Sequence, residues 1–192
     1  MNRREALKAV GLMLGSAVTP SVASFVLSGC KSVQGAPLQT LTSDQGELVA
    51  TIAELIIPET DTPGARAAGV HQFIDALLTG GYRPEEREQF MTGLAAFEDR
   101  ARKENGSSFV ENTPEQQTAL LKTLEAEAKQ TRQSGQRGDD QPRPFFPMIK
   151  ELTIAGYYTS EAGATQELRY VAVPGRYDGD VPYRKGTDRA FA

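Results

Sequence analysis

The chain has 192 residues, a formal net charge of −4 at pH 7, one cysteine and one histidine. A single cysteine excludes an internal disulfide and a multi-cysteine metal site, and a single histidine leaves no His-rich metal centre. The acidic balance comes without a basic patch and therefore argues against nucleic acid as a partner.

The first 30 residues have the layout of an export signal. Basic residues, Arg3 and Arg4 among them, come first, and an uncharged, mostly small or apolar stretch follows. The Arg pair resembles a twin-arginine signal, and Leu27-Ser28-Gly29-Cys30 resembles a bacterial lipobox. We expect residues 1–29 to be a signal peptide, Cys30 to carry lipid, and residues 30–41 to be a tether. The alternative is an uncleaved anchor helix with an incidental cysteine.

Residues 42–192 are expected to form one helical domain with an irregular arm from about residue 168. Apolar residues at helical spacing, between capping and breaking residues, predict about five helices. These segments cover residues 43–57, 70–79, 84–105, 114–130 and 145–158. The fold class is therefore all-α, a small helical bundle.

Local signals set the ends of these helices. Thr42 or Ser43 can cap the first helix, and Pro84 opens the third. Thr113 begins a capping box with Pro at the first helical position. Residues 131–144 lack apolar side chains, apart from prolines, and are expected to be a linker.

Few residues suggest chemistry. The glycine-rich motifs of nucleotide binding are absent, so no cofactor is expected on this chain. Glu59 and Asp61 could bind a cation or serve in acid–base catalysis, although such residues more often satisfy helix ends. His71 lies off the apolar stripe of its helix and is expected at the surface. An enzyme would require Glu59, Asp61 and His71 to converge.

The arm from Leu168 is rich in Gly, Pro, Tyr and Arg and has no periodicity. Tyr and Arg are enriched at interface anchors, so the arm could lie on a partner protein. Packing of the arm across its own domain is the equal alternative.

Two blocks of sequence resemble a known family. The first is Ile57–Ala65 with Ala68–Asp75, and the second is Phe145–Glu161 with Val173–Tyr177. Across residues 45–182 the chain resembles the small subunit, subunit 3, of membrane-bound gluconate 2-dehydrogenase and related sugar dehydrogenases.

The resemblance implies a non-catalytic partner of a large flavoprotein of the glucose-methanol-choline oxidoreductase family. That flavoprotein would hold FAD and the sugar, and a cytochrome c subunit often passes electrons onward in such complexes. The small subunit would carry the export signal, which places it in the cell envelope, on the periplasmic side, anchored to the inner or outer membrane. The alternative function is a stand-alone periplasmic lipoprotein that binds a ligand or scaffolds other proteins.

The resemblance also points to residues for partner binding, in the first block, at the end of the last helix and in the arm. These residues are Glu59, Asp61, Pro63, Tyr157, Tyr158, Ser160, Glu161, Pro174 and Tyr177.

Overall fold

The structure is a computed structural model that describes residues 37–133, 143–171 and the single positions 173, 175, 182, 184 and 189. The chain divides into two units, Met1–Ala36 and Pro37–Ala192, and the described residues belong to the second. Several predictions lie outside them, namely those on Arg3, Arg4, Cys30, Pro174 and Tyr177.

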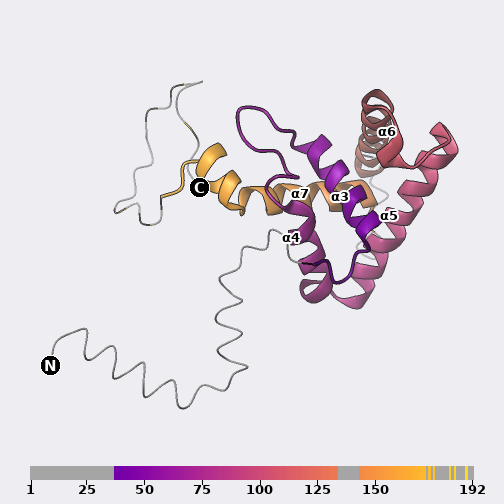
Figure 1. Cartoon of the computed structure of the whole chain (residues 1–192), viewed down its shortest axis with the longest axis horizontal. Helices are drawn as coiled ribbons and strands as arrows, with labels where there is room; N and C mark the ends of the chain where they lie inside the picture. The colour runs from indigo at the N-terminus through magenta and orange to yellow at the C-terminus, as the bar shows by residue number, and fades with distance from the viewer. Residues whose placement is uncertain are drawn as a thin grey trace, which may run out of the picture. The chain divides into compact units, whose positions relative to one another are not determined.

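The prediction of an all-α bundle is confirmed (Figure 1). Its α-helices are α3 (Ser43–Ile56), α4 (Val70–Ala76), α5 (Pro84–Asn105), α6 (Pro114–Gln133) and α7 (Phe145–Tyr158). Short helical turns named η1 (Leu77–Gly81), η2 (Phe109–Glu111) and η3 (Gly163–Glu167) follow α4, α5 and α7. The described residues from Leu168 onward lie in no helix, as expected for the arm.

The helix ends follow the local signals closely. Thr42, not Ser43, caps α3, and it forms a capping box with Gln45. Thr113 and Gln116 make the same reciprocal pair of hydrogen bonds before α6. Gly106 ends α5 with φ of 82°, a left-handed conformation that glycine adopts at little cost.

One boundary was wrong. The linker was expected from Thr131, but α6 continues through Gln133. The last turn of α6 has no apolar residue. A helix needs an apolar stripe only where it packs against the protein, so the absence of apolar residues did not mark the end of this helix. The hydroxyl of Thr131 donates a hydrogen bond to the carbonyl of Glu127 within this turn.

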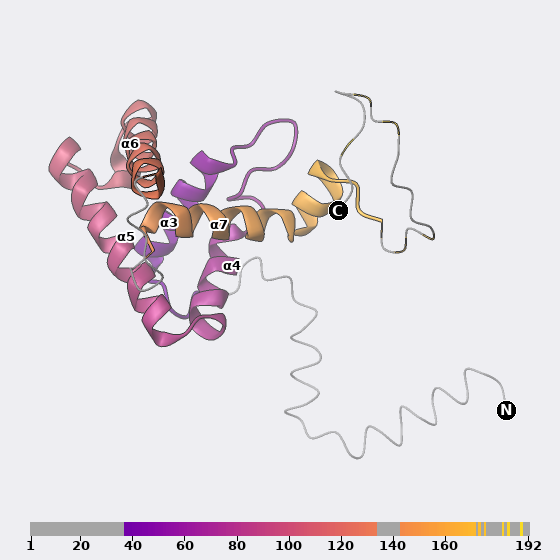
Figure 2. The same ribbon diagram turned by 180° about the vertical axis from the view of Figure 1, so that it is seen from behind.

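Helix α7 lies across α3, α4, α5 and α6, and Figures 1 and 2 show it from opposite sides. Its buried residues recur at spacings of three and four positions and so share one broad face of the helix. At Gly156, an added Cβ would lie 2.7 Å from Cδ1 of Phe73, so the glycine allows α4 to approach α7 closely.

Four phenylalanines join α5, η2 and α7 in the core. The ring of Phe97 lies 4.7 Å from that of Phe109 and 5.8 Å from that of Phe145, between centroids. Phe90 also contacts Phe145, at 5.5 Å. Tilted and edge-on pairs of this kind add to the stabilisation that burial of the rings provides.

A buried carboxylate holds the chain just before α3. Asp75 on α4 is only 4 % exposed, and its oxygens accept hydrogen bonds from three successive backbone N–H groups. The donors are Gln39, Thr40 and Leu41, at 2.8, 3.0 and 2.8 Å. A buried carboxylate requires such partners, and here the chain that enters the domain supplies them.

Candidate functional site

The loop between α3 and α4 is closed at its neck. The backbone N–H of Ala65 donates to the carbonyl of Ile57 at 2.9 Å. The carboxylate of Glu54 accepts one hydrogen bond from the N–H of Glu59 at 2.8 Å and another from that of Arg66 at 2.9 Å. These bonds fix both ends of the loop, so its exposed tip is held by the body of the domain.

Gly64 is required by this closure. A Cβ at position 64 would lie 2.3 Å from Oε1 of Glu54, which is far inside contact distance. Any side chain at position 64 would push the Glu54 carboxylate away from the two N–H groups whose hydrogen bonds it accepts. The glycine is therefore explained by a close approach of the loop to α3.

The end of α7 is attached to the same loop. The hydroxyl of Tyr157 donates a hydrogen bond to the carbonyl of Pro63 at 2.8 Å. Thr62 donates to Oε2 of Glu167 in η3 at 3.0 Å. We call this region, residues 58–65 together with residues 157–167, the loop–helix junction.

Ser160 stabilises the turn that follows α7. Its hydroxyl donates to the carbonyl of Tyr157 at 2.6 Å and accepts the N–H of Gly163 at 3.1 Å. A Cβ at Gly163 would lie 2.0 Å from that same carbonyl oxygen, so the turn packs directly onto the helix end. Both polar functions of Ser160 therefore serve the fold of the junction.

The two blocks of sequence that carried the resemblance thus meet in the structure. The family described as gluconate 2-dehydrogenase subunit 3 matches residues 43–175, which cover the first block and the second block as far as Gly175. The chain belongs to this family. Comparison with curated proteins gave no match, and comparison with solved structures gave none either.

Membership of the gluconate 2-dehydrogenase subunit 3 family makes this chain an accessory subunit of a dehydrogenase complex, with other dehydrogenase subunits as partners. A subunit must bury part of its surface against its partners. The exposed residues of the junction are available for such contact. Glu59, Asp61, Tyr158 and Glu161 are exposed. Pro63 and Ser160 are half-buried.

Tyr157 differs from the other residues expected to bind a partner. It is only 2 % exposed, and its ring meets that of Tyr158 edge-on with centroids 5.3 Å apart. Its hydroxyl is engaged by Pro63. Tyr157 therefore positions the loop, while Tyr158 presents a face to solvent.

An exposed residue that sequence reasoning missed lies beside Tyr158. Ile154 is 41 % exposed and Tyr158 is 40 % exposed, and they are one turn apart on α7. Residues at i and i+4 share a helix face, so they form an apolar stripe on the outside of the bundle. The sequence could not reveal this stripe, since almost every position of α7 is apolar.

His71 was expected at the surface, and in the structure it is half-buried. Burial lowers the pKa of His71, the charge of Arg66 lowers it further, and Glu47 opposes both. The imidazole is therefore neutral at pH 7, and its charged neighbours are Arg66 and Glu47. Glu59 and Asp61 are not among the charged groups that shift the pKa of His71.

Within residues 37–133 and 143–171, no group of three His, Cys, Asp or Glu side chains is arranged to hold a metal ion. In the same part of the chain, no helix combines the length and the apolar content that crossing a bilayer demands.

Proposed function

We propose that this chain is the non-catalytic small subunit of a membrane-associated, FAD-dependent sugar dehydrogenase complex. Its partner is a large flavoprotein of the glucose-methanol-choline family, which holds the FAD and oxidises gluconate, glucose or a glycoside. The observation that carries the proposal is the family match over residues 43–175.

The loop–helix junction is the surface proposed to bind the flavoprotein. It offers Tyr158, which forms an apolar stripe with Ile154 one turn earlier on α7, and the exposed carboxylates of Glu59, Asp61 and Glu161. Apolar anchors inside a polar rim are the usual arrangement of a protein interface. Because Glu54 already orders the loop, docking would cost little further conformational entropy.

Export and anchoring belong to the N-terminal residues. We propose that Arg3 and Arg4 direct the chain to the twin-arginine route and that the flavoprotein travels with it already folded. Acylation of Cys30 would then hold the complex at the periplasmic side of the inner or outer membrane, since more than one acyl chain gives stable attachment. A cytochrome c subunit is a further candidate member of the complex.

Co-expression with a flavoprotein of this family that is encoded beside this chain tests the roles in partner binding, export and anchoring separately. With an affinity tag on this chain, we expect the flavoprotein and its FAD absorbance to co-purify. The double variant Arg3→Lys/Arg4→Lys should leave both proteins in the cytoplasm, still associated. Cys30→Ala should release the complex from the membrane without separating the subunits.

Three results would contradict parts of the proposal. An exported, active flavoprotein in cells that lack this chain would exclude the escort role. A chain that purifies alone from co-expressing cells would favour the stand-alone lipoprotein. Membrane association that survives Cys30→Ala would exclude the lipid as the anchor.

A further inference from the structure

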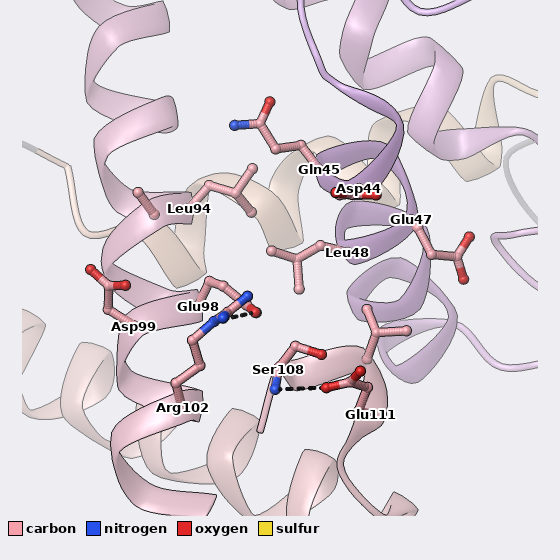
Figure 3. Close-up of a pocket in the computed structure, with 12 residues that line it drawn as sticks. Asp44, Gln45, Glu47, Leu48, Leu94, Glu98, Asp99, Arg102, Ser108 and Glu111 are labelled. Atoms are coloured by element: carbon pink, nitrogen blue, oxygen red, sulfur yellow. Dashed lines mark hydrogen bonds and ion pairs between the residues drawn. The ribbon is translucent and has the colours of Figure 1, made fainter. Parts of the chain in front are cut away.

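A groove separate from the loop–helix junction lies between the start of α3, the middle of α5 and the segment around η2 (Figure 3). Its volume is about 730 Å³. Cavities of that size are common at sites that bind ligands or peptide side chains. No residue of the junction lines the groove.

The groove has an apolar floor. Leu48 on α3 and Leu94 on α5 point toward one another across it (Figure 3). Val110 on η2 is 38 % exposed and also lines the groove. Large exposed apolar residues are rare in the described part of this chain, so Val110 marks surface that a partner could cover.

The walls of the groove are acidic. Five carboxylates and one guanidinium line it, which gives the lining a formal charge of −4. The carboxylates belong to Asp44, Glu47, Glu98, Asp99 and Glu111, and the guanidinium belongs to Arg102.

Two of these carboxylates are already paired. Nε of Arg102 donates to Oε1 of Glu98 at 3.1 Å, which engages the cation that lines the groove. Glu47 accepts from Arg66 at 2.8 Å, and Arg66 itself is not a lining residue. Both pairs are partly exposed and therefore neutralise the local field only weakly.

Glu111, one of the three remaining carboxylates, is held in its charged form. Hydrogen bonds from Ser108, from its side chain and then its backbone N–H, lower the pKa of Glu111, so this group stays ionised. Among the residues that the structure describes, no ion pair is made by Asp44 or Asp99. The groove thus combines uncompensated negative charge with one exposed apolar residue, Val110, beside Leu48 and Leu94, which are 5 % and 1 % exposed.

This combination selects the chemistry of the occupant. A sugar acid, a phosphate or a nucleic acid would be repelled by the lining. The described residues hold no set of side chains suited to a metal ion. A polypeptide with Arg or Lys beside Leu, Val or Ile can pair its cations with the acidic walls and pack its apolar side chains on the floor. The stems of the basic side chains are themselves apolar and can pack there too.

We propose that this groove is a second docking site, which takes a basic, apolar-sided segment of a partner protein. The segment lays its apolar side chains mainly on Val110, with the small exposed edges of Leu48 and Leu94 beneath, and directs its cations toward Asp44 and Asp99. This site is independent of the junction, so it stands whether or not the junction binds the flavoprotein.

Isothermal titration of the full chain tests the proposal. The probe is a synthetic amphipathic peptide of Leu and Arg with blocked ends. The same peptide with Glu in place of Arg, and spermine as a cation without apolar groups, are the comparison ligands. We expect saturable binding of the Leu-Arg peptide that weakens with added salt, and no binding of the Leu-Glu peptide.

Matched variants locate the site. Asp44→Asn/Asp99→Asn removes two exposed charges from the groove and should weaken binding roughly tenfold, the sum of two partly exposed ion pairs. Val110→Ser should weaken binding without changing its salt dependence. Glu88→Gln/Glu115→Gln removes two exposed charges from α5 and α6 outside the groove and should leave the affinity unchanged.

Four outcomes would overturn the proposal. They are failure of the Leu-Arg peptide to bind, wild-type affinity in Asp44→Asn/Asp99→Asn, equal weakening in Glu88→Gln/Glu115→Gln, and spermine binding as tightly as the peptide. Circular dichroism of each variant verifies that the fold is retained, as these substitutions lie at the surface.

Discussion

Tyr157 and Pro63 are 94 residues apart in sequence, and one hydrogen bond of 2.8 Å joins the phenolic hydroxyl of the first to the carbonyl of the second. The bond fastens the loop after α3 to the end of α7. It is a direct structural link between the two sequence blocks through which the family is recognised.

Tyr157→Phe should therefore destabilise the domain and loosen the loop. The ring stays packed, but the carbonyl of Pro63 loses its donor, which costs about 1 kcal/mol. Chemical denaturation measures the change in unfolding free energy. Tyr158→Phe is the control, because the exposed Tyr158 should tolerate loss of its hydroxyl. Equal stability of Tyr157→Phe and the wild type would show that the bond contributes nothing.

Gly64→Ala should displace the carboxylate of Glu54 and release the neck of the loop. We expect a loss of roughly 1–3 kcal/mol, since two backbone N–H groups lose a charged acceptor. Glu54→Ala removes the same acceptor, so the double variant should be no less stable than the worse single variant. Simple additivity of the two effects would mean that Gly64 and Glu54 act separately. Limited proteolysis of the loop provides a second readout.

Ile154→Asp should weaken association with the flavoprotein while leaving the domain folded. Truncation of an interface anchor commonly costs more than about 1 kcal/mol, which corresponds to roughly fivefold or more in affinity. Thermal unfolding should change little because Ile154 is 41 % exposed. Ala96→Asp, at an exposed position of α5, is the control. A co-purification yield of the flavoprotein as high with Ile154→Asp as with Ala96→Asp would exclude the stripe as the docking surface.

The stability of the domain should fall as the pH decreases below about 6.5, the unfolded-state pKa of histidine. Burial lowers the pKa of His71 in the folded state, so protons bind the unfolded chain more readily than the folded chain. The stabilisation is present above the unfolded pKa and is lost as the pH falls toward the folded pKa. His71→Gln should flatten this part of the profile.

Denaturation midpoints of wild type and His71→Gln at pH 7.5, 6.5 and 5.5 would measure the effect. Because His71 is the only histidine, the difference between the two profiles isolates its contribution. Carboxylates titrate mainly at lower pH and affect both proteins alike. Parallel profiles would mean that the pKa of His71 is the same in both states.

Most helix boundaries, although not the end of α6, were predictable because their signals are local. Thr42, Pro84, Gly106 and Thr113 each act within one turn of the helix that they begin or end. The sequence block Ile57–Ala65 was recognised as important, yet its closure by Glu54 was not, since nothing in the sequence indicates which carboxylate would accept its N–H groups.

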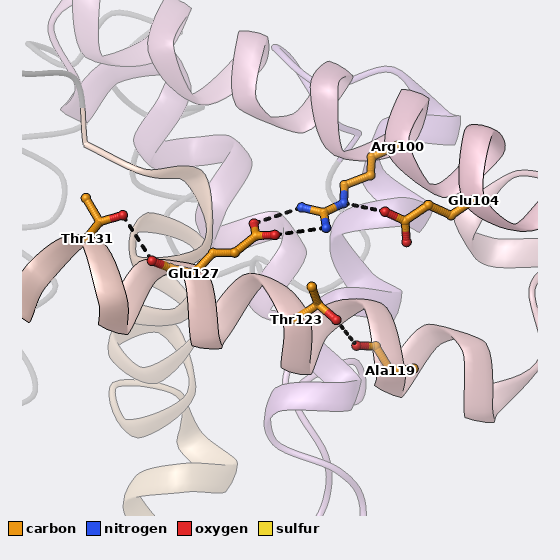
Figure 4. A network of polar contacts seen from close by, with 6 residues as sticks. All are labelled: Arg100, Glu104, Ala119, Thr123, Glu127 and Thr131. Atoms are coloured by element: carbon orange, nitrogen blue, oxygen red, sulfur yellow. Dashed lines mark hydrogen bonds and ion pairs between the residues drawn. The ribbon is translucent and has the colours of Figure 1, made fainter.

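Contacts between helices were beyond the reach of pattern reasoning. Arg100 on α5 donates two hydrogen bonds to Glu127 on α6, at 2.8 and 3.0 Å, and a third to Glu104 (Figure 4). These hydrogen bonds raise the pKa of Arg100, so it remains charged. Several Arg and Glu residues on α5 and α6 have a sequence spacing that would allow an ion pair between the two helices. Only the packing of the helices determines that Arg100 pairs with Glu127.

The three hydrogen bonds that Asp75 accepts determine where a mechanical load enters the domain. A pull on the chain ahead of Gln39 should reach α4 through this carboxylate, with the force shared by the three hydrogen bonds. The first turn of α3 would be shielded from the strain. A purification handle or a surface linkage joined before Pro37 should therefore leave the capping box at Thr42 undisturbed.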